Sequence, residues 1–388
     1  MTGFSNINKN LKEREASGLY RHRRIVSSAQ GRELVINGKK LLNFCSNDYL
    51  GLANDNRIKT AFQAGVNQWG VGSGASHLIS GHTAAHKELE AALAEFTFRE
   101  RSLLFTSGYA ANIGSINALI GPGDYAFEDR LNHASLLDGG RLSGARFSRY
   151  QHRDLEDLNN QLKRREKNKT RKLVISDGTF SMDGSICDIA GTAKIAAKHQ
   201  AWLMVDEAHS LGVTGDSGCG LVNPRHFNSN DVQILIGTLG KAFGTQGGFV
   251  AGSEELIETI IQNARTYIYS TALPASIAVA TIESLKIVTT ETWRREKLQE
   301  LIRQFREGAK RIGFDLIDSS TPIQPIMIGD SKTASKLSES LEKNGIFASA
   351  IRPPTVPKDS ARIRITLTAA HTDKDLQHLL NTLEQEYS

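Results

Sequence analysis

Two kinds of apolar spacing alternate along the middle of this chain, and together they predict its architecture. Between about residues 51 and 285, six short apolar runs are typical of buried strands: LLFTS, YAFED, KLVISD, WLMVDE, QILIGT and GGFVAG. The segments between them, such as HKELEAALAEF, repeat their apolar positions at the spacing of a helix. Strands that alternate with helices favour a mainly parallel sheet with helices on both faces, so we predict an α/β fold.

The two ends of the chain follow other patterns. The first fifty residues predict an arm with a short amphipathic helix and the segment ELVINGKKLLNF, in which Asn37-Gly38 indicates a two-residue hairpin turn. A long helical pattern begins near residue 274, and the later segments IQPIMIG, ASAIRPP and ARIRITL predict a smaller α+β domain with a C-terminal helix. We therefore expect an arm at 1–50, a large α/β domain at 51–285 and a small domain at 286–388.

Length and composition narrow the class of protein. The 388 residues exceed the ~250–300 at which a single core usually stops growing, which agrees with more than one domain. No apolar run approaches the ~18–20 residues that span a bilayer, and the opening MTGFSNINKNLKERE lacks the apolar stretch of a signal peptide. Cys45, Cys187 and Cys219 form no CxxC pair, which argues against disulfides and a zinc-thiolate site. We expect a soluble, cytoplasmic protein with no membrane contact and no metal.

The net charge of +5 raises the question of nucleic-acid binding. The basic residues concentrate in Arg21 to Arg24 and in the run from Lys163 to Lys172. Glu166 interrupts the second run, which contains no aromatic side chain to stack on bases, so a solvated helix end and loop is the favoured interpretation. We predict no nucleic-acid partner, and the positive charge suits an anionic small substrate.

Polar residues follow five of the predicted strands at the point where each strand ends. In open parallel sheets, ligands bind beyond the carboxyl ends of the strands, so these residues are expected to meet in one place. The five ends are Ser107-Gly108-Tyr109, Asn132-His133, Gly178 to Ser181, Asp206 with His209, and Thr238 with Lys241. Each alone has an ordinary interpretation, such as a helix cap for Ser107 or a surface charge for Lys241. Their conjunction indicates a ligand site.

The residue types at these ends suit one cofactor in particular. Pyridoxal phosphate requires a lysine amine for a Schiff base, an acid at the ring nitrogen and an anion site for the phosphate. Lys241 and Asp206 supply the first two, and the helix that begins after Ser107 supplies backbone N–H groups for the third. His209 would bond the phenolic oxygen, and His133 would lie against the ring. A metal site is the main rival, but Asp-Glu-Ala-His here follows a strand and does not resemble HExxH.

Ordered motifs along the chain resemble the α-oxoamine synthases, which are pyridoxal-phosphate enzymes of fold type I. The matching segments are Asn43-Phe44, Asn47 to Leu52, Gly72-Ser73-Gly74, Ser107-Gly108-Tyr109, Phe180 to Gly184, Asp206 to His209, and Thr238 to Lys241. The resemblance runs from about residue 15 to the C-terminus. It implies a large domain with a mainly parallel seven-stranded sheet, and a reaction that joins an amino acid to an acyl thioester with loss of carbon dioxide.

The same resemblance implies a role for each matching residue. Lys241 would carry the cofactor, with Asp206, His209 and His133 as its catalytic partners. The other cofactor-binding positions are Ser107, Gly108, Tyr109, Ser181 and Thr238. The substrate-binding positions are Arg21, Asn47, His133, Thr355 and Arg364, of which Arg364 would grip the amino-acid carboxylate with its planar fork.

Enzymes of this fold type are dimers with shared sites, so the resemblance also implies a homodimer. Ser270 and Thr271 would reach the phosphate in the partner's site, although both could instead be helix caps before Pro274.

The C-terminal segment indicates which substrates to expect. Ala350 to Pro357 and Ala361 to His371 resemble the members that condense L-alanine with a pimeloyl thioester, on coenzyme A or acyl carrier protein, in biotin biosynthesis. Pro353 and Pro354 would fix an extended turn that presents the hydroxyl of Thr355, or they could simply end a strand. The alternative within the family is a member that uses glycine, such as one that joins glycine to acetyl-CoA.

Overall fold

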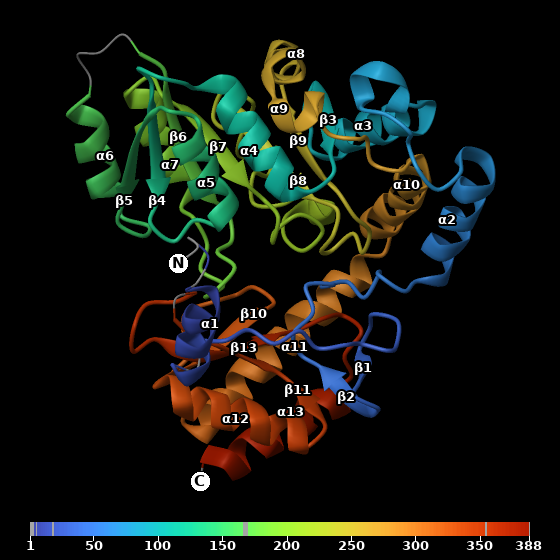
Figure 1. Cartoon of the computed structure of the whole chain (residues 1–388), viewed down its shortest axis with the longest axis vertical. Helices are drawn as coiled ribbons and strands as arrows, with labels where there is room; N and C mark the ends of the chain where they lie inside the picture. Colours follow the sequence, from blue (N-terminus) through green and yellow to red (C-terminus); the bar gives the residue numbers. More distant parts are fainter. Residues whose placement is uncertain (1–3, 5, 18, 166–169, 354, 388) are drawn as a thin grey trace.

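The computed structural model describes residues 4, 6–17, 19–165, 170–353 and 355–387. Two bodies of secondary structure lie one above the other, with a central sheet in the larger body (Figure 1). Residues 166–169 of the basic run, and Pro354 of the predicted turn, lie outside the described residues.

The larger body is built on a seven-stranded sheet in the order β3-β9-β8-β7-β6-β4-β5. The strands are β3 (Arg101–Phe105), β4 (Tyr125–Asp129), β5 (Arg146–Tyr150), β6 (Lys172–Asp177), β7 (Trp202–Asp206), β8 (Ile234–Thr238) and β9 (Gly248–Gly252). Only β9 runs antiparallel to its neighbours in this sheet. The prediction of a mainly parallel seven-stranded sheet is confirmed.

Six of these strands coincide with the apolar runs, and the seventh does not. Strands β4 and β6 are buried at every residue, as expected for strands covered on both faces. Strand β5 lies at the edge of the sheet, and Arg146 and Arg149 are exposed there. An edge strand needs no continuous apolar run, so the search for such runs did not find it.

Helices cover both faces of the sheet. They are α2 (Asn56–Trp69), α3 (Ala84–Phe96), α4 (Gly108–Leu119), α5 (Ala134–Leu142), α6 (Leu155–Lys163), α7 (Ile189–Lys198), α8 (Glu254–Asn263), α9 (Arg265–Ile268) and α10 (Ala275–Thr290), with short turns η1 (His77–Gly81) and η2 (Asp216–Gly218). Successive residues of β6 enter different cores: Leu173 and Ile175 pack with residues of α4 and α8, whereas Val174 packs with residues of α3 and α10. The alternation follows from the two-residue period of a strand.

The smaller body joins residues from both ends of the chain. It contains the sheets β1 (Glu33–Ile36), β2 (Lys39–Asn43), β11 (Ile346–Phe347) and β10 (Ile323–Gly329), β13 (Ala361–Thr366), β12 (Ser349–Ile351), with helices α11 (Thr292–Ile312), α12 (Ser331–Lys343) and α13 (Asp373–Tyr387). The predicted hairpin is confirmed, because Asn37 and Gly38 connect β1 to β2 with positive φ angles of 52° and 75°. The expected domain limit at residues 285 and 286 falls inside α10, and the division stays a proposal.

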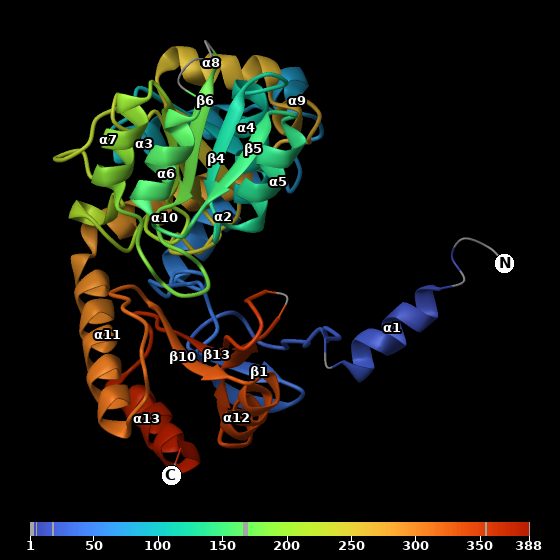
Figure 2. The same ribbon diagram turned by 90° about the vertical axis from the view of Figure 1, so that its left-hand side faces the viewer.

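Helix α1 (Ile7–Ala16) projects away from both bodies (Figure 2). None of its residues is buried: Ile7 and Leu11 expose large apolar side chains on the helix, and Phe4 does so before its start. Among the described residues, no helix combines the length and apolar character needed to cross a membrane. Cys45, Cys187 and Cys219 are free thiols.

Candidate active site

The ends of β7 and β8 bring the predicted lysine, aspartate and histidine together. The two strands are parallel neighbours, with Asp206 opposite Ile236. Beyond them, the Nζ atom of Lys241 lies 2.8 Å from Nε2 of His209. Asp206 is buried and acts electrostatically on the same amine. The meeting of strand ends expected for a parallel sheet therefore occurs here.

The carboxylate of Asp206 is held on both of its oxygens. Its Oδ2 accepts from Nδ2 of Asn112 on α4 at 2.7 Å, and its Oδ1 accepts from the backbone N–H of Ala208 at 2.9 Å. The same amide nitrogen of Asn112 donates to Ser135 Oγ at 2.9 Å. The Oδ1 atom of Asn112 is buried and lacks a hydrogen-bond partner among the described residues, which leaves a free acceptor beside Asp206.

His133 is fixed at the start of α5, at the end of β4. Its backbone N–H donates to Oδ2 of Asp177 at 2.6 Å, and its Nδ1 lies 2.7 Å from Ser135 Oγ. Asp177 ends β6 and stands directly opposite Asp206 of β7. Burial, with the charge of Asp206 next in importance, raises the pKa of Asp177 well above its usual range. A neutral carboxyl next to an ionised one is the usual result when two acids share a buried site.

Burial also shifts the basic groups of the cluster. It lowers the pKa of Lys241 to about 8, against the attraction of Asp206 and Asp177. It lowers the pKa of His209 far below its ordinary value, with Lys241 and Arg364 adding to the effect. His209 is therefore a neutral imidazole near neutral pH, and an appreciable fraction of Lys241 is a neutral amine.

The predicted phosphate-holding residues lie at the N-terminus of α4. Ser107 caps this helix, because its Oγ accepts from the backbone N–H of Ala110 at 3.1 Å. The first turn of a helix leaves N–H groups without intrahelical acceptors, which favours an anion. A Cβ atom added to Gly248 would come within 2.5 Å of the Gly108 nitrogen, so the two backbones approach closely. Thr238 lies next to Gly108, since a Cβ there would contact its side chain.

Tyr109 follows Gly108 on the first turn of α4 but points to another partner. Its hydroxyl donates to Oδ2 of Asp138 on α5 at 2.6 Å, and its side chain stays nearly half exposed. Hydrogen bonding to Asp138 raises the pKa of the phenol. Tyr109 therefore borders the expected phosphate site from the solvent side.

Arg364 connects the smaller body to the cluster. It lies on β13, and its side chain is buried. Its Nε donates to the Ser181 carbonyl at 2.7 Å, and its two NH groups donate to Thr366 Oγ1 at 2.9 Å and Asn47 Oδ1 at 3.2 Å. Three of the residues predicted from the sequence, Arg364, Ser181 and Asn47, are thus in direct contact.

Four other predicted residues lie away from the cluster. Arg21 and Thr355 are exposed, and no hydrogen bond or ion pair among the described residues joins them to Lys241 or Arg364. Thr271 pairs with Ser76 in an isolated bridge, and Ser270 precedes it in the same segment. Within one chain, these four residues are not part of the polar cluster.

The sequence reasoning missed three members of the cluster. Asp177 ends the segment KLVISD and could have been found by the same strand-end rule as Asp206. Tyr49 is inside a quoted motif, but nothing in the sequence indicated its partner: its hydroxyl lies 2.5 Å from Nδ1 of His209. Asn112 sits within an ordinary helical segment, and no local pattern distinguishes it.

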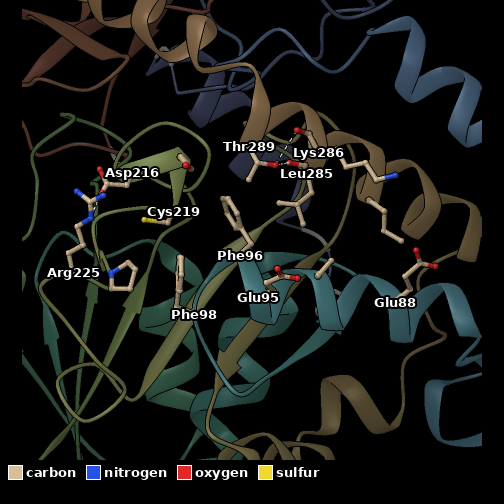
Figure 3. A pocket seen from close by; sticks show the side chains of 14 residues that line it. Glu88, Glu95, Phe96, Phe98, Asp216, Cys219, Arg225, Leu285, Lys286 and Thr289 are labelled. Carbon is tan, nitrogen blue, oxygen red and sulfur yellow. Dashed lines mark hydrogen bonds and ion pairs between the residues drawn. The ribbon is translucent and has the colours of Figure 1, made fainter.

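A separate pocket lies on another side of the larger body, between α3, α10 and the loop at 216–225 (Figure 3). Its volume is about 840 Å³, and Phe96, Phe98 and Leu285 supply apolar walls. Arg225 and Lys286 stand at opposite sides of it (Figure 3). None of the predicted site residues lines this pocket.

Comparison with known proteins identifies the family. The family described as aminotransferase class I and II matches residues 39–383. An 8-amino-7-oxononanoate synthase of Pseudomonas syringae pv. syringae is 56% identical over 377 residues, which cover 97% of this chain and 94% of the relative. The chain belongs to the 8-amino-7-oxononanoate synthase family.

Solved structures agree with the family. A serine palmitoyltransferase from S. paucimobilis with bound PLP has a TM-score of 0.93 at 29% identity, covering 99% of this chain and 97% of the other. An 8-amino-7-oxononanoate synthase from Francisella tularensis has a TM-score of 0.78 at 32% identity, covering 89% and 97%. The predictions of fold type I, of an acyltransferase and of pyridoxal phosphate as cofactor are confirmed.

The residues present fit this cofactor. The cluster offers an amine whose pKa is about 8, an acid held on both oxygens, a neutral imidazole and a helix N-terminus at one edge of the sheet. The unpartnered Asn112 Oδ1 and the close approach of Gly108 and Gly248 fit a ligand with a protonated ring nitrogen and a phosphate.

Proposed function

We propose that this chain condenses L-alanine with a pimeloyl thioester to give 8-amino-7-oxononanoate, carbon dioxide and a free thiol, in biotin biosynthesis. The observation that carries the proposal is the buried amine of Lys241, 2.8 Å from His209, in one cluster with Asp206 and Arg364. Such a cluster can hold an amino acid by its carboxylate while an amine removes a proton.

Five regions of the site would hold pyridoxal phosphate. Lys241 would bind its carbonyl carbon, and Asp206 would face its ring nitrogen. His209 would contact its phenolic oxygen, and His133 would lie against its ring face. Ser107, Gly108 and Tyr109 would hold or border its phosphate, and Ser181 and Thr238 would also line the cofactor. When bound, the cofactor supplies a ring that accepts the electron pair released when a bond to the α-carbon of the amino acid breaks.

Lys241 takes and returns the proton at the α-carbon. With a pKa of about 8, roughly one amine in ten is neutral at pH 7, whereas an ordinary lysine would be almost fully charged. A neutral amine has the free electron pair that proton removal requires. The negative charge of Asp206 favours a protonated nitrogen on any ring placed beside it.

Arg364 holds the carboxylate of alanine. Its guanidinium is fixed by three hydrogen bonds to Ser181, Thr366 and Asn47, so its orientation is set before substrate arrives. In the overall reaction, the α-carbon loses this carboxylate as carbon dioxide and gains the pimeloyl carbonyl, while the C–S bond of the thioester breaks. His133 and Asn47 line the space in which the substrate sits.

The four predicted residues outside the cluster complete the site in a homodimer. Ser270 and Thr271 serve the partner's phosphate, and Arg21 and Thr355 contact the thioester substrate. Two features support this arrangement: α1 projects from its own chain with Ile7 and Leu11 exposed, and Arg21 lies in the exposed segment that follows the helix. The three free thiols fit work in the reducing cytoplasm. An acyl carrier protein is a possible thioester donor beside coenzyme A.

Titration of the purified holoenzyme with amino acids tests the substrate. L-Alanine should change the absorption spectrum at lower concentration than glycine, and only alanine with a pimeloyl thioester should release thiol at the full rate. Pimeloyl-CoA and pimeloyl-acyl carrier protein, supplied in parallel, identify the preferred carrier. A stronger response to glycine with acetyl-CoA would contradict the proposal and identify a glycine C-acetyltransferase.

A further inference from the structure

Tyr49 occupies a position that links the reacting lysine to the smaller body. The residue is completely buried, and its backbone carbonyl accepts from the N–H of Ala369, just beyond β13. Its hydroxyl lies 2.5 Å from Nδ1 of His209, and the opposite ring nitrogen of His209 lies 2.8 Å from Nζ of Lys241. A single imidazole therefore separates the tyrosine hydroxyl from the lysine amine.

The side chain of Tyr49 stays protonated, as a neutral hydroxyl. Burial raises the pKa of Tyr49 to about 12, even though Arg364 acts in the opposite direction. The hydroxyl proton has two acceptors within reach, Nδ1 of His209 at 2.5 Å and Oδ1 of Asn47 at 3.4 Å. Tyr49 can thus donate to His209, or accept from it while it donates to Asn47.

A neutral imidazole carries one N–H, and an ammonium at Lys241 requires that it stand on Nδ1, because an ammonium cannot accept a hydrogen bond from Nε2. When Lys241 is a neutral amine, Nε2–H donates to Nζ, and the bare Nδ1 accepts from Tyr49. When Lys241 is an ammonium, Nζ–H donates to a bare Nε2, and Nδ1–H donates to the Tyr49 oxygen. When Nδ1–H donates to Tyr49, the hydroxyl can donate to Asn47, so its reversal keeps every polar atom of the three residues paired in both arrangements.

We propose that Tyr49 is a positioning residue, whose reversible hydroxyl couples the tautomer of His209 to the protonation state of Lys241. In the state that contains the neutral lysine, Tyr49 holds the ring proton on Nε2. The proposed function requires His209 to donate this Nε2–H toward a phenolic oxygen. The inference rests on that function for the identity of the reacting amine. Replacing the hydroxyl leaves Nδ1 buried without a partner, so the preference for this tautomer is lost.

Other charged or titratable groups also face the two residues. Arg364 and His133 act on His209, and Asp206, Asp177 and Arg364 act on Lys241. His209 stays neutral because its pKa lies far below the ordinary value. Among Tyr49, His209 and Lys241, the lysine is the residue that changes charge, near its pKa of about 8.

Nitrogen NMR of the cofactor-free protein with ¹⁵N-labelled histidine tests the coupling between the His209 tautomer and the charge of Lys241. The pH is varied from about 6 to about 10, on either side of the lysine pKa. His209→Gln identifies the signals of His209 among the eleven histidines. In the wild-type protein, the proton should move from Nδ1 to Nε2 with a midpoint near 8 while the ring stays neutral. Tyr49→Phe, which conserves the shape of the ring, should abolish this exchange. Tyr150→Phe is the matched control, because Tyr150 is also buried and its hydroxyl bonds Ser176 on another strand.

Kinetics of the holoenzyme supply the second readout. Tyr49→Phe should lower kcat about ten-fold, the low end of the cost of removing a partner that orients a functional histidine, with KM for alanine nearly unchanged. A wild-type ring that keeps one tautomer across the range would overturn the inference, as would normal exchange in Tyr49→Phe. If Tyr49→Phe does not fold, the wild-type titration alone decides. Because the NMR uses protein without cofactor or substrate, a failure of the proposed reaction would leave its result unchanged.

Discussion

The carboxyl edge of the seven-stranded sheet and the arm that carries Arg21 hold their functional side chains in different ways. At the sheet edge, Lys241, His209 and Asp206 are packed together, and each makes a hydrogen bond or charge contact with another member. On the arm, Arg21 is exposed and lies just after a helix with no buried residue. A single chain therefore sets the contacts and the pKa values of the reacting groups. The proposed thioester contacts, in contrast, depend on the substrate and on the partner subunit of the proposed homodimer.

The largest expected effect comes from removing the central amine. Lys241→Ala should reduce product formation by at least about 10⁴-fold, because it removes the buried amine that would carry the cofactor and move the proton. Loss of the lysine-bound cofactor absorption band and the rate of thiol release measure this. Lys286→Ala removes an exposed lysine that lines the separate pocket, and this control should behave as wild type. A substantial residual rate in Lys241→Ala would remove Lys241 from its proposed role.

Asp206→Ala should have the next largest effect. The protein should retain some cofactor but exchange the α-proton of alanine about 10²- to 10³-fold more slowly, because the carboxylate that favours a protonated ring nitrogen is gone. Deuterium exchange of alanine, followed by NMR, measures this rate. Asp216→Ala, an exposed aspartate beside Arg225, serves as the matched control. Exchange at the wild-type rate would show that Asp206 does not act on the ring.

Arg21→Ala should have the smallest effect and should appear in a different parameter. We expect KM for the pimeloyl thioester to rise about ten-fold, equivalent to about 1.4 kcal/mol, with kcat unchanged, because Arg21 is outside the reacting cluster. Steady-state kinetics with varied thioester concentration measure it, and Arg23→Ala is the control from the same exposed segment. A fall in kcat without a change in KM would place Arg21 with the reacting groups and abolish the contrast between the two regions.

Much of the fold could be predicted because its signals are local. Strands β4 and β6 are buried throughout, so continuous apolar runs revealed them, and the Asn37-Gly38 turn follows from two residues that tolerate positive φ. Strand β5 escaped because an edge strand shows no such run. The pairing of β2 with β11 could not be predicted, since it joins residues 304 positions apart through a short contact.

The residues of the site also divide into those with a local sequence signal and those without one. Strand-end positions identified Lys241, Asp206 and His209, because the carboxyl ends of parallel strands share one edge whatever the strand order. Asn112 and Tyr49 were missed, because each acts through a contact with a distant residue that no local pattern encodes.

The amino-acid sequence by itself determined the alternation of strands and helices, the polar residues at the strand ends and the family. Only the tertiary structure decided that Arg364 reaches Ser181 and Asn47, that Asp177 stands beside Asp206, and which nitrogen of His209 faces Lys241. The physical reason is that periodicity and turn chemistry depend on neighbouring residues, whereas pKa shifts and hydrogen-bond partners depend on which distant segments pack together and exclude water.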